Sequence, residues 1–215
     1  MKTKTYVLLL FLTPLSIFAQ PEKYNLQKLL NMQKLNVHRR TVSSLPHTPE
    51  AISLNESPGD GIALIKGSNF KNGIIEVDLK GKDVFQKSFI GIAFHALNDS
   101  TYDAVYFRPF NFRATDSVRR IHAVQYVSHP QHTWKKLRDT QNAVFEKAVS
   151  PVPDPNEWVH AKIVVNNNDV TVFVNHSAAP SLTVRKLNKR SSGLIGLWVG
   201  DGSGGAFKNL VVTKR

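Results

Sequence analysis

The feature that most constrains the fold is a succession of short β-type runs, each ended by turn residues. The three- and four-residue spacing of an amphipathic helix is nearly absent. The runs span residues 36–44, 50–54, 61–66, 73–80, 88–96, 102–112, 121–128, 158–166, 169–175, 181–187, 193–200 and 206–213. Short strands in this number, without the spacing of βαβ units, predict an all-β protein with two antiparallel sheets packed face to face.

Turns and helical segments fit between these runs. Asn-Asn-Asp at 167–169 predicts a tight hairpin, because Asn tolerates left-handed backbone angles. Helical spacing at residues 24–36 indicates either a short helix or a leading arm, and a helical turn is expected at 134–138 within the longest interruption, 129–157. With no internal repeat, the sequence predicts one domain over residues 20–215.

The N-terminus has the pattern of a signal peptide. Lys2 and Lys4 form a positive start, an apolar stretch too short to span a bilayer follows, and Ala19 offers a small residue for cleavage. We therefore expect residues 1–19 to direct export to the periplasm or outside the cell. No second apolar segment of membrane length follows. The chain has no cysteine, so its stability must come from burial alone.

The positive charge is scattered. The chain has 28 Lys and Arg and 16 Asp and Glu, and without Lys2 and Lys4 the balance is 26 − 16 = +10. Because the protein is expected to be exported and has no polybasic tract, we expect no nucleic-acid partner. The charge indicates mainly a solvated surface, with an acidic glycan as the alternative.

Strand alternation sorts side chains into two faces. It places Ile90, Ile92 and Phe94 in the core, and it leaves small residues on the other face. Four larger side chains are expected beside them, namely His95, Tyr106, Arg108 and Trp198. Such a surface suits a sugar, because aromatic rings stack on its C–H face and Arg or His bonds its hydroxyls. The alternative is that each is an ordinary surface residue.

Several segments in order carry a resemblance to a known family. They are FKNGIIEVDL (70–79), FIGIAFH (89–95), YDAVYFR (102–108), AVQY (123–126), residues 156–175 and residues 193–211. From about residue 70 onward the chain resembles the concanavalin A-like, laminin-G-like jelly-roll superfamily. Within it, the chain is most similar to the 3-keto-disaccharide hydrolase domain, also described as family-16-glycoside-hydrolase-like.

The resemblance implies a jelly-roll sandwich whose partner is an oligosaccharide or polysaccharide. The residues then expected to contact it are His95, Tyr106, Arg108, Gln125 and Trp198. The sequence departs from the family where His95 replaces the usual Arg and where His176 replaces the Gly of an Asn-Gly pair.

Catalytic residues are not assigned. Laminarinase-type enzymes carry Glu-x-Asp-x-x-Glu, and this chain has Glu76 and Asp78 but Gly81 at the third position. The pair is therefore interpreted as the solvated side of a strand. His129 and His132 are separated by Pro130 and lack a clear third ligand, so no metal or other cofactor is expected.

The segment 108–157 holds more aromatic and charged residues than a connector needs, including Trp134, Arg138 and Glu146. Loops at a sandwich edge often form the walls of a groove. Tyr126 and Trp134 are instead interpreted as a small core beneath the loop, with ligand contact as the alternative.

Two functions remain open. The first is a secreted domain that binds extracellular glycans. The second is a glycoside hydrolase or lyase of the 3-keto-disaccharide type.

Overall fold

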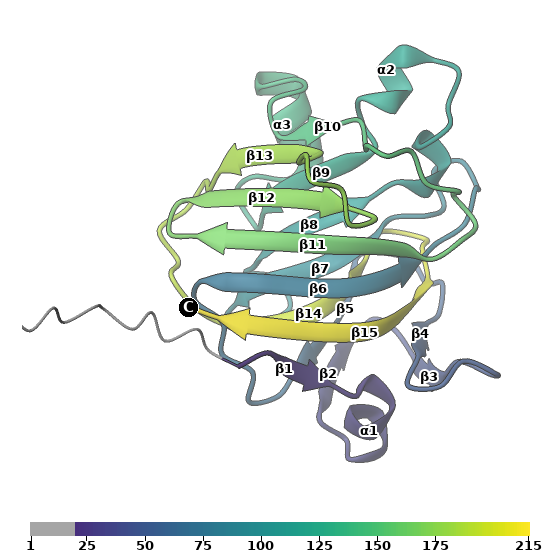
Figure 1. Ribbon diagram of the computed structural model, residues 1–215, viewed down its shortest axis with the longest axis vertical. Helices are drawn as coiled ribbons and strands as arrows, with labels where there is room; N and C mark the ends of the chain where they lie inside the picture. Colours follow the sequence, from purple (N-terminus) through teal and green to yellow (C-terminus); the bar gives the residue numbers. More distant parts are fainter. Residues whose placement is uncertain (1–19) are drawn as a thin grey trace, which may run out of the picture.

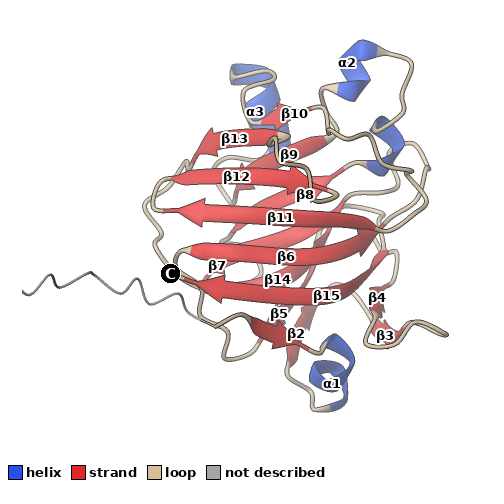
Figure 2. Ribbon diagram, viewed as in Figure 1, coloured by secondary structure: helices blue, strands red, loops and turns tan. Residues whose placement is uncertain are grey.

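A computed structural model of the protein describes residues 20–215, and the expected signal peptide, 1–19, lies outside them. Two antiparallel sheets pack face to face, which confirms the predicted sandwich (Figures 1 and 2). The first sheet, here sheet A, contains β1 (Glu22–Tyr24), β3 (Val42–Ser44), β4 (Ile52–Leu54), β6 (Gly73–Lys80), β11 (Val159–Asn166), β12 (Asp169–Val174), β13 (Leu182–Arg185) and β15 (Gly205–Lys214). The second, sheet B, contains β2 (Leu35–His38), β5 (Gly61–Ile65), β7 (Ile90–Ala96), β8 (Asp103–Phe107), β9 (Val124–Ser128), β10 (Glu146–Lys147) and β14 (Leu194–Val199).

The strand order is that of a jelly roll. Sheet A runs β13-β12-β11-β6-β15-β4-β3, with β1 also paired to β15, and sheet B runs β10-β9-β8-β7-β14-β5-β2. The chain crosses from sheet A to sheet B between β6 and β7 and returns between β10 and β11. It crosses again to β14 of sheet B after β13 and returns to sheet A at β15. These crossings place segments far apart in sequence side by side in each sheet.

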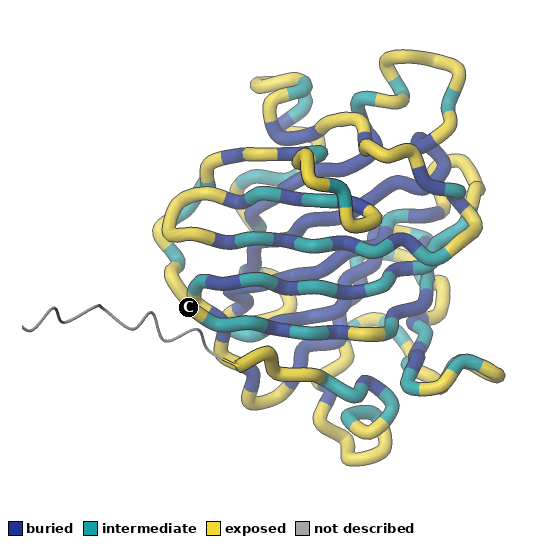
Figure 3. Tube along the Cα trace, viewed as in Figure 1, coloured by how far each residue is buried: buried dark blue, intermediate teal, exposed yellow. Residues whose placement is uncertain are grey.

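The two sheets differ in how their outer faces are covered. In β6 and β11 buried and half-buried residues alternate, as expected when one face packs on the core and the other meets solvent. In β7, β8 and β9 every residue is buried (Figure 3). A third layer therefore covers sheet B, and the connecting segments 81–89, 108–123 and 129–145 supply it.

Short helices lie in the connections. They are α1 (Leu26–Asn31), the 3₁₀ turn η1 (Pro109–Asn111), α2 (Ser117–Arg120) and α3 (Trp134–Thr140). Asn25, Asp116 and Thr133 cap the three α-helices by accepting a backbone N–H with their side chains. Of the two alternatives for residues 24–36, the structure has the short helix, α1, and the helical turn expected at 134–138 is confirmed by α3. Within residues 20–215, none of these helices has the length and apolar character needed to cross a bilayer.

Candidate functional site: a cavity on the outer face of sheet B

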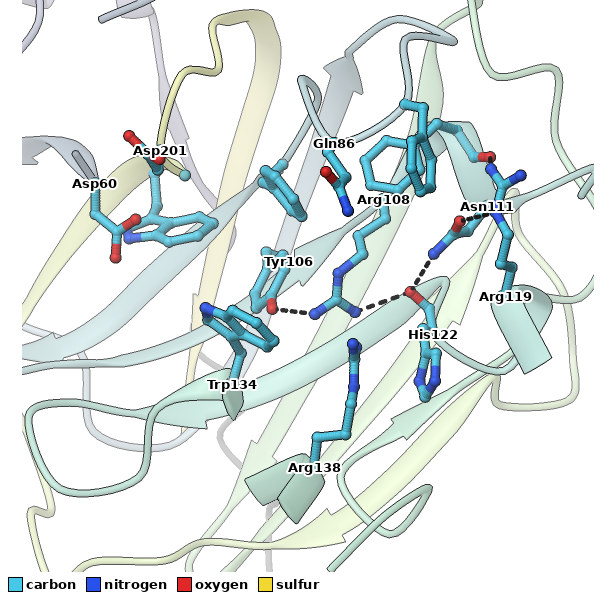
Figure 4. Close-up of a pocket in the computed structure, with 15 residues that line it drawn as sticks. Asp60, Gln86, Tyr106, Arg108, Asn111, Arg119, His122, Trp134, Arg138 and Asp201 are labelled. Atoms are coloured by element: carbon cyan, nitrogen blue, oxygen red, sulfur yellow. Dashed lines mark hydrogen bonds between the residues drawn. The ribbon is translucent and has the colours of Figure 1, made fainter. Parts of the chain in front are cut away.

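A cavity of about 460 Å³ opens on the face of sheet B that points away from sheet A. Tyr126 of β9 points toward sheet A, where its hydroxyl accepts the backbone N–H of Leu187 at 3.3 Å. Its neighbour Gln125 pairs in register with Tyr106 of β8, so both must point to the opposite face. The cavity is formed on that face, between sheet B and the third layer (Figure 4).

Two aromatic rings form the floor. Tyr106 and Trp198 lie with ring centroids 4.8 Å apart, and Trp198 Nε1 donates to the Tyr102 hydroxyl at 3.0 Å. Gly91 pairs with both residues, and a Cβ there would come within 2.5 Å of the Tyr106 Cα. The absence of a side chain at Gly91 therefore allows the close approach of the β8 backbone. Tyr106 and Trp198 are only 2% and 4% exposed.

Arg108 is held beside this floor by a buried hydrogen-bond network. Its Nη2 donates to the Tyr106 hydroxyl at 2.5 Å and also to Gln125 Oε1, and its Nη1 donates to the His122 carbonyl at 2.8 Å. The Tyr106 hydroxyl donates to the same Gln125 oxygen at 2.6 Å. Burial raises the pKa of Tyr106 to about 12, so its phenol stays protonated at neutral pH. Gln125 is fully buried behind the other two and does not line the cavity.

Glu146 supplies the negative charge in this region. Its carboxylate accepts both Arg138 Nε and Nη2, at 3.1 and 2.9 Å, and lies 3.3 Å from Arg108 Nη1. His122 Nδ1 lies 2.9 Å from it. Burial raises the pKa of Glu146, but the Arg138 hydrogen bonds and the two guanidinium charges outweigh burial and leave the pKa below its ordinary value. Burial lowers the pKa of His122 despite the nearby carboxylate, which favours a neutral imidazole.

Exposed aromatic rings line the walls. Trp134, the first residue of α3, is 48% exposed, and Phe85, from the loop after β6, is 57% exposed. The Arg138 guanidinium lies 5.3 Å from the Trp134 ring centroid. The interpretation of Tyr126 and Trp134 as one small core is therefore wrong for Trp134, which lines the cavity, while Tyr126 belongs to the core.

Asp60 and Asp201 form the end of the cavity opposite the arginines (Figure 4). Asp201 Oδ1 accepts the Gly59 N–H at 2.6 Å, which joins the loop before β5 to the turn after β14. Burial raises the pKa of Asp60, and this outweighs a hydrogen bond from the Asp201 backbone that lowers it.

His95 is a correction to the predicted site. A β-bulge in β7 shifts its register against β14 between Leu194 and Gly196, and His95 takes a positive φ of 48°. The extra residue reverses the alternation, so His95 points into the core. There its Nε2 lies 2.8 Å from the Lys71 carbonyl oxygen and its Nδ1 lies 3.5 Å from the Asp103 carboxylate. The structure therefore brings Tyr106, Arg108 and Trp198 together at the cavity, with Gln125 behind them, and leaves His95 out.

Glu76 and Asp78 lie far from this cavity in the fold, on the outer face of sheet A. Asp78 pairs in register with His160, whose Nδ1 lies 2.8 Å from its carboxylate, and Asn209 donates to it at 2.7 Å. The pair is half-buried and bonded rather than simply solvated. Among residues 20–215, no three His, Asp or Glu side chains are grouped to hold a metal ion.

A family model described as a 3-keto-alpha-glucoside-1,2-lyase-like domain matches residues 45–213. The chain belongs to this family. The match confirms the resemblance drawn from the strand motifs, and it covers most of the part that the structure describes. A comparison with curated proteins finds no match.

Solved structures with the same fold include binding proteins and enzymes. The carbohydrate binding module CBM66 from Bacillus subtilis has a TM-score of 0.59 at 15% identity, covering 82% of this chain and 93% of that one. A protein of unknown function with a galectin-like fold from Bacillus subtilis has a TM-score of 0.57 at 13% identity, covering 90% of this chain and 96% of that one. Bacillus licheniformis β-glucanase has a TM-score of 0.51 at 16% identity, covering 84% of this chain and 87% of that one. At these identities the likeness establishes the concanavalin A-like fold alone.

Three features of the site escaped the sequence interpretation: Phe85, Arg119 and the Asp60–Asp201 end. All lie on loops or a one-turn helix, where no periodicity indicates direction. The available signal was that strands 88–96, 102–112 and 121–128 lack a continuous polar face. Such strands must be covered on both sides, which points to the neighbouring loops.

Proposed function

We propose that this domain is exported and binds a saccharide in the cavity of sheet B. The observation that carries the proposal is the combination of exposed rings at Trp134 and Phe85 with hydrogen-bonding groups at both ends of one cavity. Saccharides offer apolar C–H faces and many hydroxyls, which match rings and polar groups respectively. The cavity volume, about 460 Å³, is within the range of small-ligand sites.

Further support comes from the comparisons and from the N-terminus. CBM66 is a carbohydrate-binding module with the same fold, and the family model is named after an activity on a keto-glucoside. Residues 1–19 have the pattern of a signal peptide, which supports action in the periplasm or outside the cell.

A second candidate function is the elimination named in the family's description. In a 3-keto-glucoside the ketone acidifies the proton on C2, so that a base can remove it while the bond from C1 to the leaving oxygen breaks. The leaving oxygen then takes a proton. His122 favours this candidate, because it lines the cavity, lies 2.9 Å from Glu146 and has a lowered pKa that keeps it able to accept a proton.

One experiment tests both candidates. A panel of disaccharides and a nitrophenyl 3-keto-α-glucoside are titrated into the wild type and into Trp134→Ala, with calorimetry for binding and absorbance for nitrophenol. We expect Trp134→Ala to weaken binding about tenfold, because a stacked aromatic contributes roughly 1–2 kcal/mol. The matched control is Trp158→Ala, at a half-buried tryptophan beside Lys208 on sheet A. The affinity of this variant for the saccharide should equal that of the wild type.

The outcomes are distinct. Equal affinity in wild type and Trp134→Ala, or no binding across the panel, would rule out this cavity as the saccharide site. Release of nitrophenol that disappears in His122→Asn, together with the unsaturated sugar that elimination leaves, would establish the lyase instead of a binding module.

A further inference from the structure

The charges around the cavity are unevenly distributed. Asp60 and Asp201 lie at one end. Three guanidinium groups lie at the other end, from Arg108, Arg119 and Arg138 (Figure 4). A neutral sugar does not require such a concentration of positive charge. The question is therefore which negatively charged groups compensate the three arginines.

Glu146 is the one carboxylate that contacts this group within residues 20–215, and it accounts for only part of the charge. It bonds Arg138 in a two-pronged arrangement and contacts Arg108. Three guanidinium charges against one carboxylate leave 3 − 1 = +2. The lowered pKa of His122, caused first by burial, means that this histidine adds no charge at neutral pH.

Arg119 is the group whose charge is least compensated. Its Nε donates to Asn111 Oδ1 at 3.3 Å and its Nη2 donates to the Phe110 carbonyl at 2.8 Å, and both acceptors are neutral. Its guanidinium lies 4.6 Å from the Phe85 ring centroid. Among the described residues, no carboxylate lies within ion-pair distance of it. These contacts fix the guanidinium at the cavity wall and leave Nη1 for a ligand.

A fixed, partly buried guanidinium without a counter-ion favours an anionic group, because Arg binds carboxylate and sulfate oxygens through two parallel hydrogen bonds. The acidic pair at the other end disfavours a polymer with regularly spaced negative charge. It suits instead the hydroxyls of a sugar, which donate to carboxylates. The cavity therefore fits a ligand with one anionic end and one hydroxyl-rich end.

We infer that the saccharide carries one acidic substituent, a carboxylate or a sulfate, which binds between Arg119 and Arg138. This inference rests on the proposed saccharide site and specifies its ligand class. The rings of Trp134 and Phe85 contact the sugar between the two ends, and Asp60 and Asp201 accept hydrogen bonds from its hydroxyls.

The test compares three disaccharides that differ only at the terminal sugar: glucose, glucuronate or glucose 6-sulfate. Affinities are measured by NMR titration at low and high NaCl. We expect the wild type to bind the glucuronate or the sulfate form about tenfold more tightly than the glucose form, as for one charge-assisted hydrogen-bond pair. The preference should shrink in high NaCl. The acidic form with the larger increase in affinity over the glucose form identifies the substituent.

Arg119→Gln should abolish the preference, so that the ratio of the affinity for the acidic forms to the affinity for the glucose form falls to about one. Arg120→Gln is the matched control, because Arg120 neighbours it on α2 but donates to the Ala114 and Thr115 carbonyls outside the cavity. Arg119→Lys keeps the positive charge but lacks the planar guanidinium that donates two parallel hydrogen bonds, so it should retain part of the preference. Thermal unfolding midpoints verify that each variant is folded.

Equal binding of all three disaccharides would overturn the acidic-ligand inference and leave the saccharide site standing. A preference unchanged in Arg119→Gln would overturn the assignment of the anion to this residue. Binding of none of the three would remove both this inference and the proposed function.

Discussion

Glu146 shows how one residue organises the cavity. It is 1% exposed and contacts Arg108, Arg138 and His122 at once, which joins β8, α3 and the turn before β9. A carboxylate removed from water in this way is stable only because positively charged donors surround it. Its position therefore determines where both guanidinium groups lie.

Replacing this carboxylate should destabilise the fold in a pH-dependent way. We expect Glu146→Gln to lower the free energy of unfolding at pH 7 by roughly 3 kcal/mol, the lower end for a broken buried ion pair because Arg138 is partly exposed. Asp139→Asn is the control, since Asp139 pairs with Lys135 on the surface of α3 and should change stability by less than about 0.5 kcal/mol. Urea denaturation measures both.

The direction with pH follows from the lowered pKa of Glu146. Its contribution is complete above the ordinary carboxyl value of about 4.3 and is lost as the pH falls through the lower native value. The difference in the free energy of unfolding between wild type and Glu146→Gln should therefore be complete at pH 7 and should decrease below about pH 4. A gap that is absent at pH 7, or that widens in acid, would contradict this role.

Residues with a clear alternation phase were predictable from the sequence. Tyr106, Arg108 and Trp198 share a face because their strands keep the two-residue period. His95 was misplaced because a bulge adds one residue to β7, and no residue type in FIGIAFH marks that insertion. Arg119 could not be placed, because a one-turn helix gives no periodicity.

Among the elements, the outer face of sheet A has an ionic pair that the sequence did not indicate. Glu-x-Asp in an alternating strand is ordinary, and the partner of Asp78 lies 82 residues away, on β11. The sequence interpretation expected replacement of Glu76 and Asp78 to leave stability nearly unchanged. The contacts of Asp78 with His160 and Asn209 change that expectation.

Asp78→Asn should destabilise the protein by about 1 kcal/mol at pH 5.5 and by less at pH 8.5. The hydrogen bond with Asp78 raises the pKa of His160, so the contribution of His160 is complete below about pH 6.5 and is lost as the pH rises through the raised value. Burial raises the pKa of Asp78, but hydrogen bonds from His160 and Asn209 lower it below the ordinary value, so Asp78 stays ionised throughout this interval.

Thermal unfolding at the two pH values measures the effect. Asp169→Asn, at an exposed aspartate on β12 of the same sheet, is the control and should show no such difference. An equal loss of stability for Asp78→Asn at pH 5.5 and 8.5 would show that the ionic pair does not contribute as described.

At the scale of the whole molecule, the strand runs predicted two antiparallel sheets packed face to face, and the family resemblance implied a jelly roll. The third layer over sheet B was not predicted, because its segments are held by side-chain contacts such as Arg138 with Glu146 rather than by a repeating pattern. That layer creates the cavity on one face of the sandwich. Sheet A, with its alternating half-exposed face, has no equivalent cover over β6 and β11.

The three tryptophans provide the most direct test that saccharide binds on sheet B. Trp134 and Trp198 line the cavity, whereas Trp158 packs beside Lys208 on sheet A. In a ¹H–¹⁵N NMR titration with a saccharide that binds, the indole Nε1–H signals of Trp134 and Trp198 should shift together along one saturation curve, and that of Trp158 should not move. A shift at Trp158 with Trp134 and Trp198 unchanged would contradict the account.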